Sequence, residues 1–289
     1  MKKQLFNVLL CCLIWLPLMG VKAQSTVVEG QSTEGKDFWV TFMQADQGSN
    51  ALILQLSISA REDCEVIISN PYTAYKDTFS VTANVMKLVE VYRGSSPIAS
   101  TVRSEMKETG KVCYAVNSEQ VDTCALHVEA SKNISLFATN YKYATFDATN
   151  VLPTPSLLDE YIIQTYTPSD HQNTASDKSK SQGSHLAIIA AEDNTIVDYC
   201  PTEMTKRYNE AFEKAGLGYY LTPEDSALLS YKVGDTLHTP VLKKGQVYYI
   251  WTGKKDNTQG DLSGTYVKAR NGKKIAVFQG CPHTNVPYE

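Results

Sequence analysis

The sequence predicts a mainly β protein made of two tandem, related β-sandwich-like units, with one short helix inserted in the second unit. Short apolar runs closed by Asn, Asp, Gly and Pro recur along the 289-residue chain, which is typical of β-sandwiches. One segment of 16 residues recurs in the second half of the chain. Strands do not alternate with long helical patterns, so a doubly wound parallel sheet is not expected.

The clearest strand pattern is Leu52–Ile58, where every second residue is Leu or Ile and where Gln55 and Ser57 lie between them. Alternation with a period of two indicates a strand that buries one face. Trp39 and Trp251 lie in two of the other runs and are predicted core residues. Those runs are Phe38–Phe42, Val66–Ile68, Val85–Tyr92, Ser135–Ala138, Tyr161–Tyr166, Leu186–Ala190, Ile196–Tyr199, Val247–Trp251 and Ile275–Phe278.

The internal repeat aligns Leu56–Pro71 with Leu186–Pro201 without a gap, and six of the 16 positions are identical. Each copy is a strand, an acidic turn, a second strand and a proline. A shorter similarity relates Val128–Phe137 to Val267–Phe278, with two extra residues in the second copy. Two copies indicate a duplicated unit and not a solenoid.

The repeat sets the expected domain boundaries. Residues 1–23 are a signal peptide, 24–33 an N-terminal linker, 34–150 the first β unit and 151–289 the second. The predicted inserted helix is Glu203–Ala215, because its apolar residues fall on one helical face and Gly216 follows. The polar stretch Ser169–Ser184 is predicted to be a loop, either mobile or ordered by a partner.

The N-terminus has the three parts of a secretory signal. Lys2 and Lys3 precede the uncharged apolar run Leu5–Met19, and Val21–Ala23 provides small residues for cleavage after Ala23. A membrane anchor is the alternative, but the run is short for a span and is followed closely by Gly20. We therefore expect a secreted or cell-surface protein without a membrane span after cleavage.

The charge balance argues against nucleic acid as a partner. Residues 1–23 contain three of the 27 basic residues and none of the 31 acidic ones, so cleavage leaves 24 against 31, a net charge of −7. Nucleic-acid binding requires a basic surface that displaces counterions. Docking on anionic lipid requires a basic surface as well.

Five cysteines follow the signal, and Cys113 with Cys124 is the best disulfide candidate because a polar turn separates them by eleven positions. Export permits such a bond. The partners of Cys64, Cys200 and Cys281 are not assigned, and an odd number leaves at least one without a partner. None of the cysteines has CxxC spacing, so neither a metal nor a redox site is expected.

Motifs for catalysis are weak, and no cofactor, metal ligand or catalytic residue is predicted. The sequence has no HExxH and no GxSxG. Cys281 and His283 flank a proline that breaks the strand, so a structural cysteine is favoured over a nucleophile. Asp256–Asp261 resembles part of a calcium loop but lacks the closing Glu.

Two acidic pairs, Glu62-Asp63 and Glu192-Asp193, could serve a glycosidase as acid and base or nucleophile. They are equivalent positions of the repeat, and Asp stabilises turns through its own backbone. We therefore interpret them as turn residues.

Six segments together resemble the bacterial domain that is similar to the N-terminal region of the IgG Fc-binding, mucin-associated protein. They are Thr33–Met43, Leu186–Val197, Leu242–Tyr248, Asp261–Thr265, Ile275–Gly280 and Val286-Pro287, in that order. The resemblance implies a secreted or surface β domain with an adhesive role, and it carries no catalytic residues. Such domains continue with further strands beyond the position of Glu289, so we expect a shortened second unit. The inserted helix also departs from the pattern.

The leading hypothesis is an exported binding or adhesion module that recognises a host glycoprotein, such as mucin or IgG Fc, or another surface polymer. Tyr141, Tyr143 and Tyr219-Tyr220 lie near loops, where tyrosines serve either packing or contact with sugars and proteins. The alternatives are a secreted carbohydrate-active enzyme with paired carboxylates and a structural component of a surface assembly. The sequence assigns no ligand-binding residues.

Overall fold

The computed structural model describes residues 32–45, 51–96, 98–142, 145–168, 182–216, 221–253, 260–282 and 284. Residues 32–289 form one compact unit. Antiparallel strands dominate it, which confirms the predicted mainly β class. The predicted signal peptide and its cleavage site after Ala23 lie outside the described residues.

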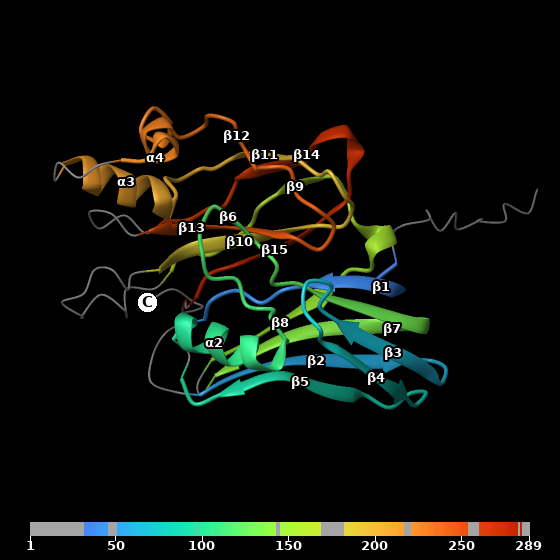
Figure 1. Ribbon diagram of the computed structural model, residues 1–289. Coiled ribbons are helices and arrows are strands. Elements are labelled where there is room, and N and C mark those ends of the chain that lie inside the picture. The colour runs from blue at the N-terminus through green and yellow to red at the C-terminus, as the bar shows by residue number, and fades with distance from the viewer. Residues whose placement is uncertain are drawn as a thin grey trace, which may run out of the picture. The chain divides into compact units, whose positions relative to one another are not determined.

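In the first half, a long bent strand organises a seven-stranded sheet (Figure 1). This strand is β7 (Leu126–Lys142), which pairs with three other strands along its 17 residues and with a fourth that follows it. The partners are β1 (Glu34–Val40), β2 (Leu52–Ala60), β3 (Cys64–Ser69) and β8 (Thr145–Val151); β4 (Lys76–Val81) pairs with β3, and β5 (Lys87–Gly94) pairs with β2. A short 3-10 helix, η1 (Thr154–Ser156), follows β8.

In the second half, two four-stranded sheets take the place of one. The first has the order β15-β10-β13-β6 and the second β12-β11-β14-β9. Their strands are β6 (Gln120–Asp122), β9 (Glu160–Ile162), β10 (Gln182–Ala190), β11 (Val197–Cys200), β12 (Leu237–His238), β13 (Val247–Gly253), β14 (Tyr266–Ala269) and β15 (Ile275–Gly280). Between β14 and β15 the chain makes a 3-10 turn, η4 (Arg270–Gly272).

The two copies of the sequence repeat occupy equivalent places in the pairing. Ile58 of β2 pairs with Leu136 of β7, and Ile188 of β10, 130 residues later, pairs with Val277 of β15. Ala60 with Ile134 and Ala190 with Ile275 repeat the same register. The single strand β7 thus corresponds to β14 and β15, which η4 separates because the second copy is two residues longer.

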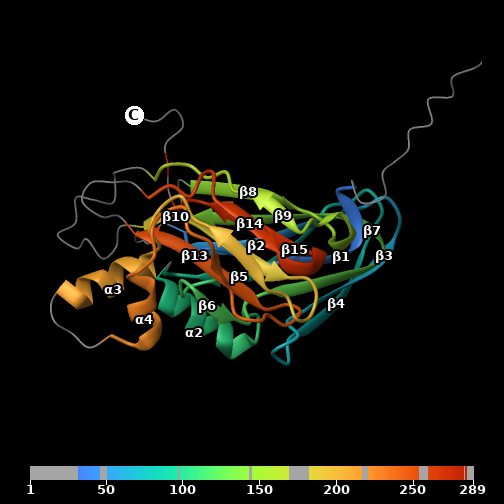
Figure 2. The same ribbon diagram turned by 90° about the horizontal axis from the view of Figure 1, so that it is seen from above.

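The sequence of each central strand reflects how many of its faces are covered. In β2 every second residue is buried, so one face packs inward. Residues 186–190 of β10 are all apolar and all buried, because its sheet lies between two others (Figure 1). In the view from above, the sheets overlap one another (Figure 2). Ala187 and Ile189 join the core of the first half, whereas Leu186 and Ile188 pack toward β11 and β14.

The helices cover sheet ends. The predicted helix is present as α3 (Lys206–Gly216), starting three residues later than expected, and a short α4 (Pro223–Leu228) follows. Helix α2 (Ala99–Thr109) was not predicted, although its buried residues Ala99, Val102 and Met106 have helical spacing. It ends at Gly110, whose φ of 72° is the left-handed conformation that favours glycine.

One strand of the first half belongs to a sheet of the second. β6 pairs with β13, so Gln120–Asp122 closes the edge of the middle sheet. The predicted boundary at residue 150 stays a prediction, as does the tandem-sandwich detail. Trp39 and Trp251 are 2% and 4% exposed, which confirms both as core residues.

Candidate functional site

One concave surface is a groove of about 890 Å³, which we call the strand-edge groove. Its walls come from β8, from the residues around β9 and from β15, and its floor includes Trp39 and Phe42. Trp39 and β15 lie far in sequence from the segment that holds β8 and β9, and the fold brings them together where the first half faces the middle sheet. A groove of this size falls in the range of ligand sites.

Large apolar side chains line the groove while remaining exposed. Phe146 is 68% exposed, Ile162 73% and Tyr166 61%. Phe146 lies on β8, an edge strand that pairs only with β7 among the described strands and whose residues 146–150 are all exposed. Tyr141 on β7, one of the tyrosines considered for packing or contact, packs edge-on against the Phe146 ring at 6.4 Å. Clustered exposed apolar surface marks interaction sites.

Polar groups in the groove are held by hydrogen bonds. The amide of Asn140 donates to the backbone oxygen of Met43 at 3.4 Å, and the backbone N–H of Gln164 donates to the Gln279 side chain at 3.0 Å. The Thr165 hydroxyl donates to the carboxylate of Asp261. Amide and hydroxyl groups beside aromatic rings suit either a sugar or an extended peptide.

His185 lines the groove but does not act as an acid–base group near neutral pH. Its ring is buried, and burial lowers its pKa to about 3. The neutral imidazole meets the Tyr249 hydroxyl at 2.8 Å. This histidine therefore has a packing role in the groove floor.

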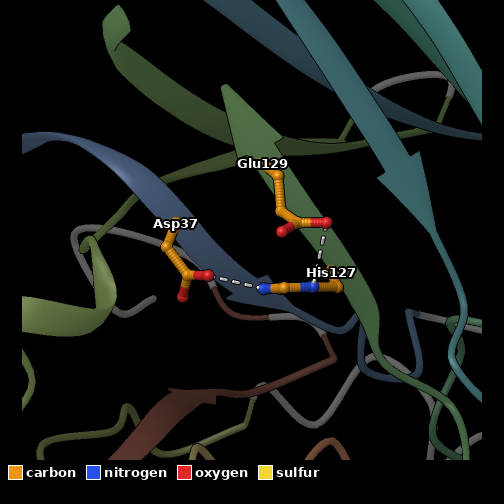
Figure 3. Close-up of side chains that lie close together, drawn as sticks. All are labelled: Asp37, His127 and Glu129. Atoms are coloured by element: carbon orange, nitrogen blue, oxygen red, sulfur yellow. Dashed lines mark hydrogen bonds and ion pairs between the residues drawn. The ribbon is translucent and has the colours of Figure 1, made fainter. Parts of the chain in front are cut away.

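A second cluster joins Asp37, His127 and Glu129 (Figure 3). Oδ2 of Asp37 lies 2.7 Å from Nε2 of His127, and Oε2 of Glu129 lies 3.6 Å from Nδ1. Thr154 donates a hydrogen bond to the other oxygen of Asp37. Burial raises the pKa of Asp37, but the hydrogen bonds from His127 and Thr154 outweigh it and hold this pKa below its usual value.

The cluster arises from strand register. Asp37 and Trp39 alternate on β1, and they pair with Glu129 and His127 on β7. The His127 ring stacks on Trp39 at 4.2 Å, and the ammonium of Lys244 lies 5.7 Å from the Trp39 ring centroid. The stack thus links the first half to the turn before β13.

The three side chains of this cluster could hold a cation, because one ligand atom from each lies within 4.8 Å of the others. However, the two carboxylates face opposite nitrogens of the ring, as Figure 3 shows. A metal at Nε2 would have to replace the Asp37 hydrogen bond, and tetrahedral sites need further ligands. The geometry is that of a histidine hydrogen-bonded to Asp37 with Glu129 beside its other nitrogen, and sequence reasoning missed it because Asp37 and His127 lie 90 positions apart.

The acidic pairs considered as glycosidase carboxylates have structural partners. Asp63 accepts the backbone N–H of Ala83 at 2.7 Å, and Asp193 accepts that of Lys244 at 2.9 Å. Glu62 pairs with Lys132, and Glu192 accepts the backbone N–H of Lys274 and pairs with Lys273. These contacts fit the interpretation as turn residues.

The structure gives Cys113 and Cys124 as free, fully buried thiols. The hydroxyl of Thr41 lies 2.6 Å from the backbone oxygen of Cys124 and 3.3 Å from that of Cys113, so the two segments are neighbours. The disulfide between them stays a prediction. Cys64 and Cys200 are also free thiols.

Several predicted features fall outside the described residues. These are residues 256–259 of the calcium-like loop, residues 169–181 of the polar loop, Tyr143, Tyr219, Tyr220 and His283. The disfavoured alternative, in which Cys281 is a nucleophile beside His283, is therefore not described either.

None of the described helices is long and apolar enough to cross a membrane. Residues 147–289 match the family described as IgGFc binding protein, and this confirms the family resemblance for that segment. The quoted segment Thr33–Met43 lies outside the match. Neither a curated protein nor a solved structure matches the chain.

Proposed function

We propose that this chain, whose residues 147–289 match the IgGFc binding protein family, is an exported binding module for a host glycoprotein such as mucin or IgG Fc. It contacts the glycoprotein at the strand-edge groove. The matched segment contributes much of the groove, because β8, β9 and β15 all lie largely within residues 147–289.

The observation that carries the proposal is the exposure of Phe146, Ile162 and Tyr166 in one groove. Burying such side chains against a ligand lowers the free energy by about 25 cal/mol per Å² of apolar surface. Aromatic anchors with a polar surround are also the residues that dominate binding energy at protein interfaces. The groove supplies both.

The test measures binding of folded Gln24–Glu289 to immobilised mucin and to IgG Fc. We expect saturable binding to one of them. The double variant Phe146→Ser/Tyr166→Ser should weaken it at least tenfold, since loss of anchor side chains costs more than about 1.4 kcal/mol in total.

Met86 provides a matched control, because it is 64% exposed but lies directly before β5, outside the groove. Met86→Ser should leave binding unchanged. A folded protein that binds neither ligand, or groove variants that bind as well as the parent, would contradict the proposal.

A further inference from the structure

A separate pocket of about 440 Å³ lies between α3 and the segment that leads into β6. The segment provides Asn117 and Ser118, and β6 provides Gln120. Helix α3 provides Lys206, Arg207 and Lys214. None of these six residues lines the strand-edge groove.

The charge of the pocket differs from that of the chain. Three lining side chains are cationic, and Glu210 is the single carboxylate among the lining residues that the structure describes. Glu210 lies 3.3 Å from the Lys206 ammonium, which also sits 4.2 Å above the Trp251 ring. The whole chain carries a net charge of −4, so this concave cationic surface is a local exception. Its sign indicates an anionic ligand.

The pocket is formed before any ligand binds, because a buried carboxylate fixes its two walls to each other. Glu119, between two lining residues, is buried and 4% exposed. It accepts hydrogen bonds from the Thr205 hydroxyl and the backbone N–H of Arg207 at the start of α3. It also accepts one from Tyr199 at 3.4 Å.

The backbone of Glu119 supports the same geometry. Its φ of 54° is in the left-handed region, which non-glycine residues adopt at a cost. Its N–H donates to the backbone oxygen of Tyr249 at 2.6 Å, and the neighbouring Ser118 hydroxyl accepts the N–H of Trp251 at 3.2 Å. Residues 118–120 are therefore anchored to β13, and an anchored site loses little entropy on binding.

We propose that this pocket binds an acidic sugar of a glycoprotein glycan, one that carries a carboxylate or a sulfate ester. The cationic side chains pair with the anionic group, and the amides of Asn117 and Gln120 bind sugar hydroxyls. A nucleotide fits less well, because the apolar lining is limited to Val116 and Ala211 and offers little surface to a planar base. The inference rests on the proposed function and adds a second, sugar-specific contact to it.

The test measures binding of three soluble probes by calorimetry at low salt: sialyllactose, sulfated lactose and neutral lactose. We expect saturable binding of one or both acidic sugars, weakened by added salt because salt screens charges. Which acidic probe binds shows whether the anion is a carboxylate or a sulfate. Equal binding of neutral lactose, or no binding of either acidic sugar, overturns the proposal.

The variant Lys206→Gln/Lys214→Glu should weaken acidic-sugar binding more than tenfold. Lys76→Glu is the control for charge reversal, since Lys76 is an exposed lysine on β4 outside the pocket. Unchanged binding in the Lys206→Gln/Lys214→Glu variant overturns the proposal. The two proposals can fail separately. Groove variants test the binding of mucin or Fc, whereas pocket variants test the binding of the soluble acidic sugars.

Discussion

The hydroxyl of Tyr249 lies 2.8 Å from Nδ1 of His185, and both side chains are buried beneath the strand-edge groove. Burial lowers the pKa of His185 to about 3, far below its value in an unfolded chain of about 6.5. Below pH 6.5 the unfolded chain therefore binds a proton that the folded protein does not. Protonation of His185 in the unfolded chain therefore lowers the free energy of unfolding below pH 6.5, and this loss is absent above that pH.

This predicts a loss of stability in acid that one substitution removes. Between pH 6 and pH 4 the free energy of unfolding should fall by up to roughly 1.4 kcal/mol per pH unit on account of His185. In His185→Gln this contribution disappears, so its urea-unfolding free energy should depend less steeply on pH. The exposed His238 provides the control variant His238→Gln, which should keep the parent slope. A His185→Gln slope equal to that of the parent would refute the assignment.

The tight approach of Gly245 to Trp39 gives a second prediction. Gly245 has a φ of 81°, and an added Cβ would lie 2.7 Å from the Trp39 ring. Gly245→Ala should therefore cost about 1–2 kcal/mol for the backbone and roughly 1–3 kcal/mol more for the clash.

Gly234 allows the backbone cost to be measured without a clash, because its φ is 94° and nothing lies within 4 Å of an added Cβ. Gly234→Ala should lose only the backbone contribution. Chemical denaturation of both variants measures the loss in the free energy of unfolding. Equal losses would mean that the Trp39 side chain moves to make room for the methyl group.

The cysteines differ in predicted reactivity. Burial raises the pKa of Cys113 to about 12 and raises that of Cys124 as well, so both thiols stay protonated near neutral pH in the folded protein. Cys200 is partly exposed, with its Sγ 3.2 Å from the Thr236 hydroxyl. Iodoacetamide at pH 8 should label Cys200 in the folded state, and it should label Cys113 and Cys124 only after unfolding and reduction.

The same peptide map tests the predicted disulfide. Because the buried thiols are protonated, a bond between them has to form before the core closes. We expect protein folded in an oxidising compartment to yield a linked Cys113–Cys124 peptide that reductant separates. If the two cysteines are alkylated in denaturant without reductant, the disulfide prediction is wrong.

Local pattern was sufficient to predict the strands whose burial is regular. The alternation in β2 and the unbroken apolar run in β10 distinguish a strand covered on one face from a strand covered on both. The repeat likewise predicted two acidic turns, and Asp63 and Asp193 do accept backbone N–H groups there. Strand β8 was missed because its residues 146–150 are all exposed, which leaves no alternation to detect.

The sequence by itself determined the mainly β class, the internal repeat and the position of α3. These features depend on burial and capping, which produce recognisable patterns among residues that are neighbours in the sequence. Only the tertiary structure decided which side chains share a site. Phe146, Ile162 and Phe278 meet in one groove, and His127 meets Asp37 across two strands. Such contacts depend on strand order and register between distant segments, and a single sequence does not record which strands become neighbours.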